Sequence, residues 1–336
     1  IKKIGQNIKF DFIVFFKHGI NMTSMEDTML MSYVLDAGKN RHNMDTLSEI
    51  HLNHKTISFK DLVGTGKKEI NFSEVDVEKA KDYAAEDADI TFRLYKKFQK
   101  SLKDEKMINI YEIFEKPLLK ILAFMEIEGV KIDNKFLKSL STKFEKKIVK
   151  IQNEVFKISK KEFNIASPKQ LGEILYNDLK IADLKKTKKG SFATSASVLE
   201  DLAFKGHKFP QLVLDWRQVS KLKNTYSDSL PEHINPNTQR VHTSFLLAAT
   251  TTGRLASSDP NLQNIPIKSE DGKDIRKAFI AKKDHVLISA DYNQIEMRIL
   301  ADLADVKGLK KAFKNNEDIH SLTASQIFNV DIKKVN

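Results

Sequence analysis

The chain has 336 residues and carries 56 lysine and arginine against 45 aspartate and glutamate residues, a formal net charge of +11. This length allows two or three domains with separate cores, and the basic balance favours a polyanionic partner such as nucleic acid. The absence of cysteine excludes disulfides and thiolate metal sites, so any metal would need oxygen or imidazole ligands.

No segment predicts a membrane span or a secretion signal. The most apolar run, Phe12 to Phe16, is far shorter than the roughly 18 residues that a span needs, and no signal-peptide pattern opens the chain. We therefore expect a soluble cytoplasmic protein. The chain begins with Ile1 at the approach to an expected strand and ends without a helix stop signal, so we expect an internal piece of a longer protein.

Residues 1 to about 103 are typical of an α/β region. The segment Ile8-Lys9-Phe10 predicts a strand, and the alanine-rich run 83–98 predicts the last of several helices. Between them, residues 54–71 predict turns because this stretch contains two closely spaced glycines.

From about residue 104 the pattern becomes helical. Apolar residues recur every three or four positions with lysines between them, which predicts a long amphipathic helix that needs a partner helix. The stripe consists of Phe136, Leu140, Phe144, Ile148, Ile151, Val155 and Ile158. Capping boxes at 167–170 and 197–200 predict two shorter helices. The lysine-rich loop 185–189 is either solvated or in contact with phosphate.

The C-terminal part of the chain has the most specific pattern. Residues 241–245 alternate like a strand, and residues 251–267 combine Gly, Ser, Asp, Asn and Pro in a stretch too polar for a core. A further strand is predicted over residues 286–288. Helices are predicted to begin near residue 294 and at residues 316–318.

Three acids and one tyrosine stand out chemically. Asp291 follows the last predicted strand, where it either clamps Mg²⁺ for phosphoryl transfer or caps the next helix. Asp11 interrupts an apolar run, so a cation or a buried donor should lie near it. Tyr83 and Asp87 share a helix face, which offers either a metal ligand beside a water-orienting hydroxyl or an ordinary polar face.

Five strings in collinear order resemble the family A DNA polymerases of bacteria. TTGRLASSDPNLQNIPI, SADYNQIEMRILADLADV and EDIH resemble the first half of the polymerase domain. Upstream, GQNIKFDFIVFFKHGI and YAAEDADITFRLYKKF resemble the second and third motifs of the 3′-5′ exonuclease domain, with HNMDTLSEIHLNHKTISF between them. The resemblance covers essentially the whole chain.

The resemblance implies a multidomain fold of α/β and α+β type. By this resemblance the chain divides into four parts: the C-terminal part of a ribonuclease H-like 3′-5′ exonuclease domain (1–103), palm entry and helical thumb (104–230), the N-terminal part of a right-hand palm with motif A (231–307) and the start of the fingers (308–336).

The resemblance also implies roles in synthesis. Asp291 is the expected ligand of two Mg²⁺ ions and a catalytic residue. Glu296 is the expected steric gate against a 2′-hydroxyl, with Gln294 beside the incoming nucleotide and His320 on its triphosphate.

A second set of residues is expected to bind DNA. Arg254, Gln263 and Asn264 resemble contacts to the minor-groove side of the primer terminus. Lys268 stands where an arginine is common, and Asn293 where a serine is common. The tip and stem of the thumb are expected to grip the duplex through Lys185, Lys186, Lys188, Lys189, Lys221 and Lys223.

For editing, the resemblance makes Asp11 and Asp87 ligands of divalent metals and Tyr83 the residue that orients the attacking water. The first exonuclease motif, an Asp-x-Glu pair, is expected to precede Ile1. The triphosphate-binding fingers helix and the second palm carboxylate are expected to follow Asn336.

We therefore expect a DNA-directed DNA polymerase for replication and repair, using Mg²⁺, primer-template DNA and deoxynucleoside triphosphates, and working as a monomer in the bacterial cytoplasm or an organelle. Two alternatives are a stand-alone 3′-5′ exonuclease, which would have no use for residues 241–336, and a nucleic-acid-binding remnant without activity.

Overall fold

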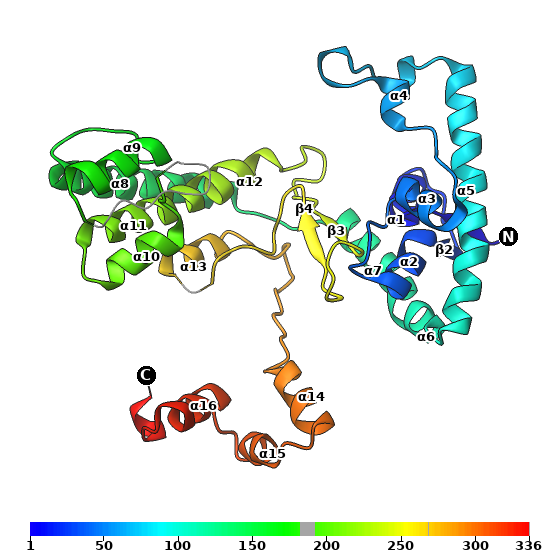
Figure 1. Ribbon diagram of the computed structural model, residues 1–336. Coiled ribbons are helices and arrows are strands. Elements are labelled where there is room, and N and C mark those ends of the chain that lie inside the picture. The colour runs from blue at the N-terminus through cyan, green and yellow to red at the C-terminus, as the bar shows by residue number, and fades with distance from the viewer. Residues whose placement is uncertain (182–191, 268, 336) are drawn as a thin grey trace. The chain divides into compact units, whose positions relative to one another are not determined.

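The computed structural model describes residues 1–181, 192–267 and 269–335. It divides into two compact units, Ile1–Ile280 and Ala281–Asn336, which are described separately (Figure 1). Among the described residues, no helix is both long and apolar enough to cross a membrane.

The first unit begins with short strands and helices around one hydrophobic core. In chain order these are β1 (Lys3–Gly5), α1 (Ile8–Lys17), β2 (Met25–Asp27), α2 (Thr28–Asp36), α3 (Met44–Leu52), α4 (Phe59–Val63), η1 (Gly66–Lys68), η2 (Phe72–Glu74), α5 (Val77–Asp104), α6 (Ile108–Ile110), η3 (Tyr111–Glu115) and α7 (Lys116–Glu128). β1 and β2 are parallel, with Lys3 opposite Met25. The core includes Leu30, Leu47, Ile90, Leu94, Phe98 and Leu122.

The strand predicted over residues 8–10 is wrong, because these residues form the start of helix α1. The carboxylate of Asp27, at the end of β2, accepts the backbone N–H groups of Asn7 at 3.1 Å and Ile8 at 3.0 Å. This cap comes from a distant residue, so the local pattern did not reveal it. As a result, Asp11 lies exposed on a helix instead of interrupting a buried strand.

Helix α5 confirms the helix predicted over residues 83–98 and extends it at both ends. Asp76 caps it by accepting the N–H groups of Glu78 and Lys79. Its buried face repeats at Ile90, Leu94, Phe98 and Leu102, and α2 and α3 pack against it (Figure 1). This face anchors the helix that carries Tyr83 and Asp87.

A second hydrophobic core forms around α8 (Asn134–Ser159). The predicted stripe is confirmed: Leu140, Phe144, Ile151 and Val155 are buried, and its other members pack against this core. The partner elements are α11 (Lys208–Leu222) and η5 (Lys223–Asp228). The remaining elements here are α9 (Pro168–Gly172), η4 (Glu173–Asp178), α10 (Ala196–Phe204), α12 (Ser229–Glu232) and α13 (Glu270–Arg276).

The two predicted capping boxes differ in outcome. Ser167 caps α9 by accepting the N–H of Gln170, as predicted. Helix α10 instead begins after Ser195, which makes no side-chain cap bond. The hydroxyl groups of Ser195 and Ser197 lie 3.0 Å apart, so these serines bond to each other.

The strand predicted over residues 241–245 is confirmed with a shift. β3 (Ser244–Leu246) pairs with β4 (Ala256–Ser258) in an antiparallel hairpin. Val241 forms isolated bridges with Val130 and Ile234. The hairpin thus lies within the predicted palm segment.

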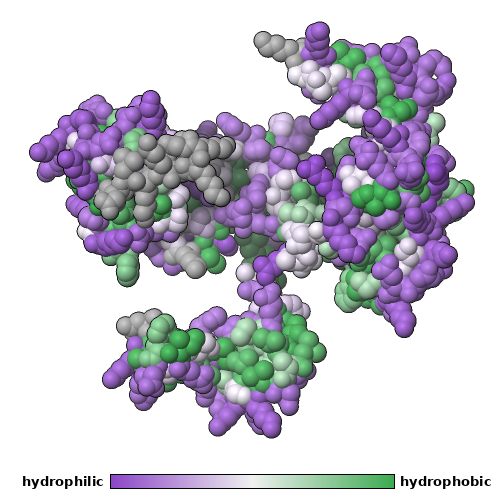
Figure 2. Space-filling view, viewed as in Figure 1, coloured by the Kyte–Doolittle hydropathy of each residue, from purple (hydrophilic) through white to green (hydrophobic). Residues whose placement is uncertain are grey.

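The second unit contains α14 (Ile295–Leu303), α15 (Lys307–Lys314), α16 (Ile319–Phe328) and η6 (Ile332–Lys334). Both predicted helix starts are confirmed, and Asp318 caps α16 through the N–H groups of His320 and Ser321. Apolar side chains gather on the visible face of this unit (Figure 2).

The strand predicted over residues 286–288 is wrong. Val286, Leu287 and Ile288 are 79%, 63% and 87% exposed, and within the described ranges no strand pairs with them. A strand needs a neighbour for its backbone groups, however apolar its side chains are. Helix α14 starts after Gln294 without a side-chain cap, so Asp291 does not act as its cap either.

Candidate functional site

Asp11 and Asp87, far apart in the sequence, line the same pocket. This pocket has a volume of about 430 Å³ and is bounded by β1, the start of α1 and one face of α5. Gly5, Ile8 and Thr91 contribute to its wall. The structure therefore brings together two of the three residues that the sequence assigned to editing.

Tyr83 lies close to Asp87, one member of this pair. Burial together with the nearby Asp87 carboxylate raises the pKa of Tyr83 to about 12. The tyrosine thus keeps its proton at neutral pH and remains a donor. The predicted common face of Tyr83 and Asp87 is present.

The two carboxylates lie in surroundings that disfavour their charge. Burial raises the pKa of Asp87, and partial desolvation of the carboxylate raises the pKa of Asp11 although that residue as a whole is exposed. The Oδ1 atom of Asp87 is buried and has no hydrogen-bond partner. Carboxylate oxygens, one of them unsatisfied, are donors of the kind that a hard divalent cation prefers, although among the described residues these two acids do not form part of a group of three or more such ligands.

Several side chains that support Tyr83 were missed by the sequence reasoning. The rings of Phe59 and Phe72 lie 6.1 and 6.2 Å from that of Tyr83, centroid to centroid. Glu86 accepts the N–H of Ile57 at 2.6 Å and contacts His54 Nε2 at 2.7 Å. The available signal was the pair of aromatic residues, Phe59 inside the turn-rich stretch and Phe72 directly after it.

The residues assigned to nucleotide addition lie in the second unit. Asp291 and Glu296 are exposed, with Glu296 in the first turn of α14 and Gln294 at its N-cap. His320 lies in the first turn of α16. Their convergence on one nucleotide stays a prediction.

A metal at Asp291 is not supported by the surrounding donors. Asp291 is a single exposed carboxylate, and the described residues contain no group of three or more His, Cys, Asp or Glu that could hold a metal ion. One carboxylate in water does not bind Mg²⁺ firmly. The two-ion site expected from the resemblance is therefore not formed by the described residues themselves.

The residues assigned to the primer terminus lie exposed in the first unit. Asn264 accepts a hydrogen bond on its backbone oxygen from the buried hydroxyl of Tyr226. Gln263 donates its N–H to Asn261 at 3.0 Å, and the oxygen of Arg254 accepts the Thr250 hydroxyl at 2.6 Å. These bonds hold the backbone while leaving the three side chains at the surface.

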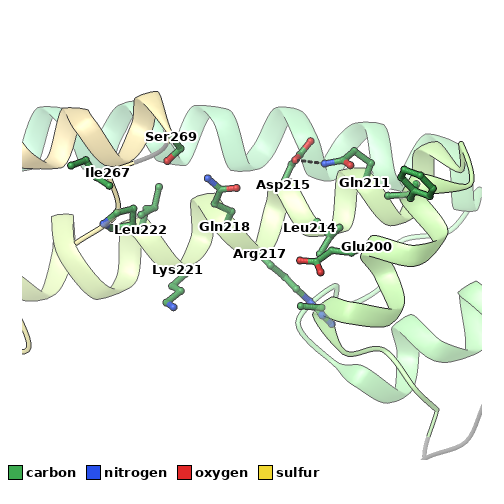
Figure 3. A pocket seen from close by; sticks show the side chains of 14 residues that line it. Glu200, Gln211, Leu214, Asp215, Arg217, Gln218, Lys221, Leu222, Ile267 and Ser269 are labelled. Atoms are coloured by element: carbon green, nitrogen blue, oxygen red, sulfur yellow. Dashed lines mark hydrogen bonds between the residues drawn. The ribbon is translucent and has the colours of Figure 1, made fainter. Parts of the chain in front are cut away.

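The two described lysines that were assigned to the thumb differ in their surroundings. Lys221 is exposed and lines a cavity of about 900 Å³ between α10, α11 and residues 266, 267 and 269 (Figure 3). Lys223 is 19% exposed, with its ammonium 2.8 Å from Asp228 and 3.3 Å from Glu145. The other predicted DNA contacts, Lys185, Lys186, Lys188, Lys189 and Lys268, lie outside the described residues.

Comparison with known proteins defines the class. Residues 134–336 match the model of DNA polymerase family A, and residues 1–103 match the 3′-5′ exonuclease model. The chain belongs to DNA polymerase family A. The resemblance and the fold class that followed from it are thus confirmed.

Individual relatives agree with this class. The chain is 48% identical to DNA polymerase I of Rhizobium leguminosarum, covering 99% of the chain and 33% of that protein. It is 42% identical to DNA polymerase I of Pseudomonas aeruginosa, covering 99% and 37%. The chain thus spans about a third of the length of these curated relatives.

A solved structure is similar over the entire chain. It is the POL domain of Pol1 from M. smegmatis in complex with DNA primer-template and dNTP, with a TM-score of 0.83 and 30% identity. The match covers 100% of this chain and 55% of the solved one.

Proposed function

We propose that this chain is part of a DNA-directed DNA polymerase that extends a primer with deoxynucleotides and removes misincorporated ones with a 3′-5′ exonuclease. The observation that carries the proposal is the convergence of Asp11 and Asp87 on one pocket beside Tyr83, in a chain whose other part matches DNA polymerase family A. Two functions thus lie in one polypeptide.

In editing, Asp11 and Asp87 hold a divalent cation, for which we propose Mg²⁺. When bound, such a cation polarises the phosphate and lowers the pKa of a coordinated water. Tyr83 keeps its phenolic proton and orients the attacking water by hydrogen bonding. The pocket walls limit the space around the terminal phosphodiester.

In synthesis, the proposed roles follow the family. Asp291 is a ligand for Mg²⁺ once further donors join it. Glu296 lies over the sugar of the incoming deoxynucleoside triphosphate, and Gln294 lies near the same nucleotide. His320 contacts its triphosphate. Support for these roles comes from the family match and from the exposure of Asp291 and Glu296 beside the start of α14.

The partners we propose are primer-template DNA and deoxynucleoside triphosphates, with the protein acting as a monomer in the bacterial cytoplasm. The net charge of +11 favours a polyanionic partner, and a similar solved structure is a complex with primer-template and dNTP. Lys221 and the exposed Arg254, Gln263 and Asn264 are the described DNA contacts we propose.

The test uses the full-length product of the source gene and a labelled primer with a matched or a mismatched 3′ end. We expect extension of the matched primer, and excision before extension of the mismatched one, both requiring Mg²⁺. Binding without either reaction would overturn the proposal and favour the remnant. Excision without extension would favour the stand-alone exonuclease, although the polymerase match over residues 134–336 already counts against it.

A further inference from the structure

Helix α1 presents two different faces to two different parts of the first unit. Ile8, Asp11 and Phe15 line the pocket that contains Asp87. Lys9 and Ile13 line a separate cavity of about 290 Å³, shared with residues 244–249 of the β3 segment. A step of two residues turns a helix by roughly 200°, so Lys9 and Asp11 lie on nearly opposite sides of α1.

Lys9 joins α1 to α7 and β3 through buried charges. Its side chain is 7% exposed and forms an ion pair with Glu126, whose side chain is 10% exposed. The Lys9 ammonium also donates to the backbone oxygen of Phe245 at 2.7 Å. Glu126 Oε1 in turn accepts the N–H of Phe245 at 2.6 Å, so both backbone groups of one β3 residue are bound by this pair.

These contacts cross between the two regions with separate family matches. Lys9 lies in the exonuclease match and Phe245 in the polymerase match. Leu247, 3% exposed, belongs to the same hydrophobic core as Ile8 and Phe12. In addition, the N–H of Gly253, in the β3–β4 connection beside Arg254, donates to the Tyr33 hydroxyl at 3.1 Å.

The geometry of the link restricts the rotation of α1. Separating the members of a buried, hydrogen-bonded ion pair leaves an uncompensated charge. Lys9, Glu126 and Phe245 are therefore held in a single arrangement. Turning α1 about its axis would pull Lys9 away from Phe245 and would move Asp11 on the opposite face. The cap from Asp27 holds the start of α1 but acts along the helix axis.

We infer that Lys9 is a positioning residue for editing: through Glu126 and Phe245 it fixes the placement of Asp11 opposite Asp87 relative to the β3–β4 hairpin. This inference rests on the proposed exonuclease function. According to this inference, the β3–β4 hairpin, which lies in the polymerase match, supports the editing pocket. A substitution in β3 therefore alters excision although β3 does not contact the nucleotide.

The first test measures amide hydrogen exchange in this chain. Lys9→Met keeps the aliphatic stem and removes the charge, and Lys17→Met, at the exposed end of the same helix, is the matched control. We expect Lys9→Met to speed exchange about tenfold in both α1 and β3, and Lys17→Met to change neither. Faster exchange confined to α1, or no change, would overturn the link.

The second test measures excision and extension in the full-length gene product. We expect Lys9→Met to lower kcat for excision about tenfold to a hundredfold, with KM for the single-stranded 3′ end and the extension rate unchanged. Lys9→Arg, which restores the charge, should recover most of kcat. Unchanged excision in a variant whose β3 exchange has risen would refute the positioning role.

The two proposals fail differently. If the wild-type protein excises nothing while Lys9→Met still speeds exchange in α1 and β3, the exonuclease function is wrong, and with it the role of Lys9 in editing. If the wild type excises normally and Lys9→Met, confirmed as folded, does so equally well, only the Lys9 inference is wrong.

Discussion

The carboxylate of Asp27 accepts the backbone N–H of Ile8 at 3.0 Å, so a residue at the end of β2 caps the helix that carries Asp11. The same side chain accepts the N–H groups of Met29 and Leu30 at the start of α2. It is 1% exposed, and burial raises the pKa of Asp27 to about 6.

Replacing Asp27 should therefore destabilise the first unit strongly. Asp27→Ala leaves donors at two helix starts without their acceptor, and we expect a loss of about 3 kcal/mol in the free energy of unfolding. The matched control is Asp76→Ala, which removes a single exposed cap from α5 and should cost about 1 kcal/mol. Urea unfolding measures both losses in the free energy of unfolding. Equal losses would show that Asp27, which caps two helices, stabilises the protein no more than the single cap from Asp76 does.

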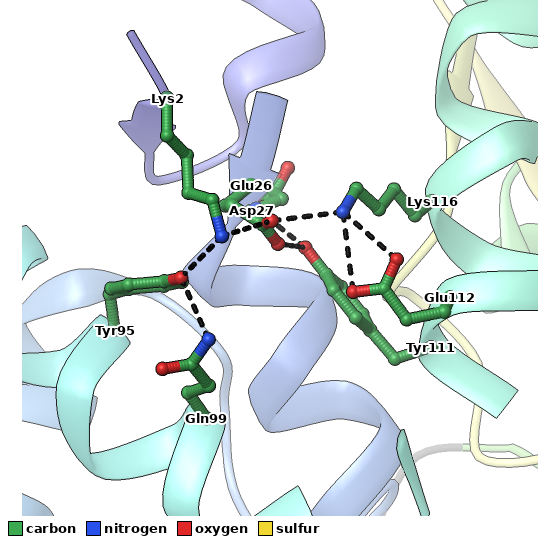
Figure 4. A network of polar contacts seen from close by, with 8 residues as sticks. All are labelled: Lys2, Glu26, Asp27, Tyr95, Gln99, Tyr111, Glu112 and Lys116. Atoms are coloured by element: carbon green, nitrogen blue, oxygen red, sulfur yellow. Dashed lines mark hydrogen bonds and ion pairs between the residues drawn. The ribbon is translucent and has the colours of Figure 1, made fainter. Parts of the chain in front are cut away.

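Glu26 should make stability depend on acid pH. It is buried, yet hydrogen bonds from Lys116, Lys2 and Tyr111 outweigh that burial and hold the pKa of Glu26 below its usual value of 4.5 (Figure 4). A lowered folded-state pKa contributes stability above pH 4.5 that is lost as the pH falls through that folded-state pKa.

The variant Glu26→Gln tests this dependence. At pH 7 it should be less stable than the wild type, because Lys116 and Lys2 lose their charged partner. The difference in urea midpoint should shrink as the pH falls from 4.5 through the lower folded-state pKa, where the wild-type carboxylate of the folded protein becomes protonated. A difference that is constant with pH would contradict the assignment.

If Asp291 holds a metal ion in the transition state, as we propose, Asp291→Ala in the full-length gene product should lower primer extension by about a thousandfold or more. Binding of primer-template should stay within about twofold. Asp302→Ala, on the outer part of α14, is the control and should extend normally. Preserved synthesis by Asp291→Ala would refute the assigned role.

Glu296→Ala should weaken sugar discrimination. If this side chain blocks a 2′-hydroxyl, its removal should raise ribonucleotide incorporation relative to deoxynucleotides by at least about tenfold, or about 1.4 kcal/mol. The comparison uses kcat/KM for each nucleotide, with Glu317→Ala as an exposed control. Unchanged selectivity would rule out the gate.

The two described lysines assigned to the predicted thumb, Lys221 and Lys223, should differ in DNA binding. Lys221→Ala should reduce the slope of log K against log salt by about 0.9, as expected for one lost phosphate contact. Lys223→Ala should reduce it less, because that ammonium is already neutralised by Asp228 and Glu145. Titration of labelled primer-template at several salt concentrations measures both, and a larger effect at Lys223 would mean that its ion pairs open on binding.

Long helices and their caps were predictable from the chain alone. The stripe of α8 and the alanine-rich run of α5 have the helical period, and Ser167 and Asp318 lie next to the amide groups they cap. Helical hydrogen bonds join residues four apart, so the necessary information is local. The family strings likewise assigned Asp11, Tyr83 and Asp87 to one function before any geometry was known.

Contacts between distant residues needed the folded structure. Residues 8–10 are helical because Asp27 caps the start of α1. Residues 286–288 are not in a strand because a strand forms only beside a neighbouring strand. The pocket shared by Asp11 and Asp87 and the link from Lys9 to Phe245 likewise join groups far apart in the chain. Such pairings depend on how whole elements pack, and no local sequence pattern encodes that packing.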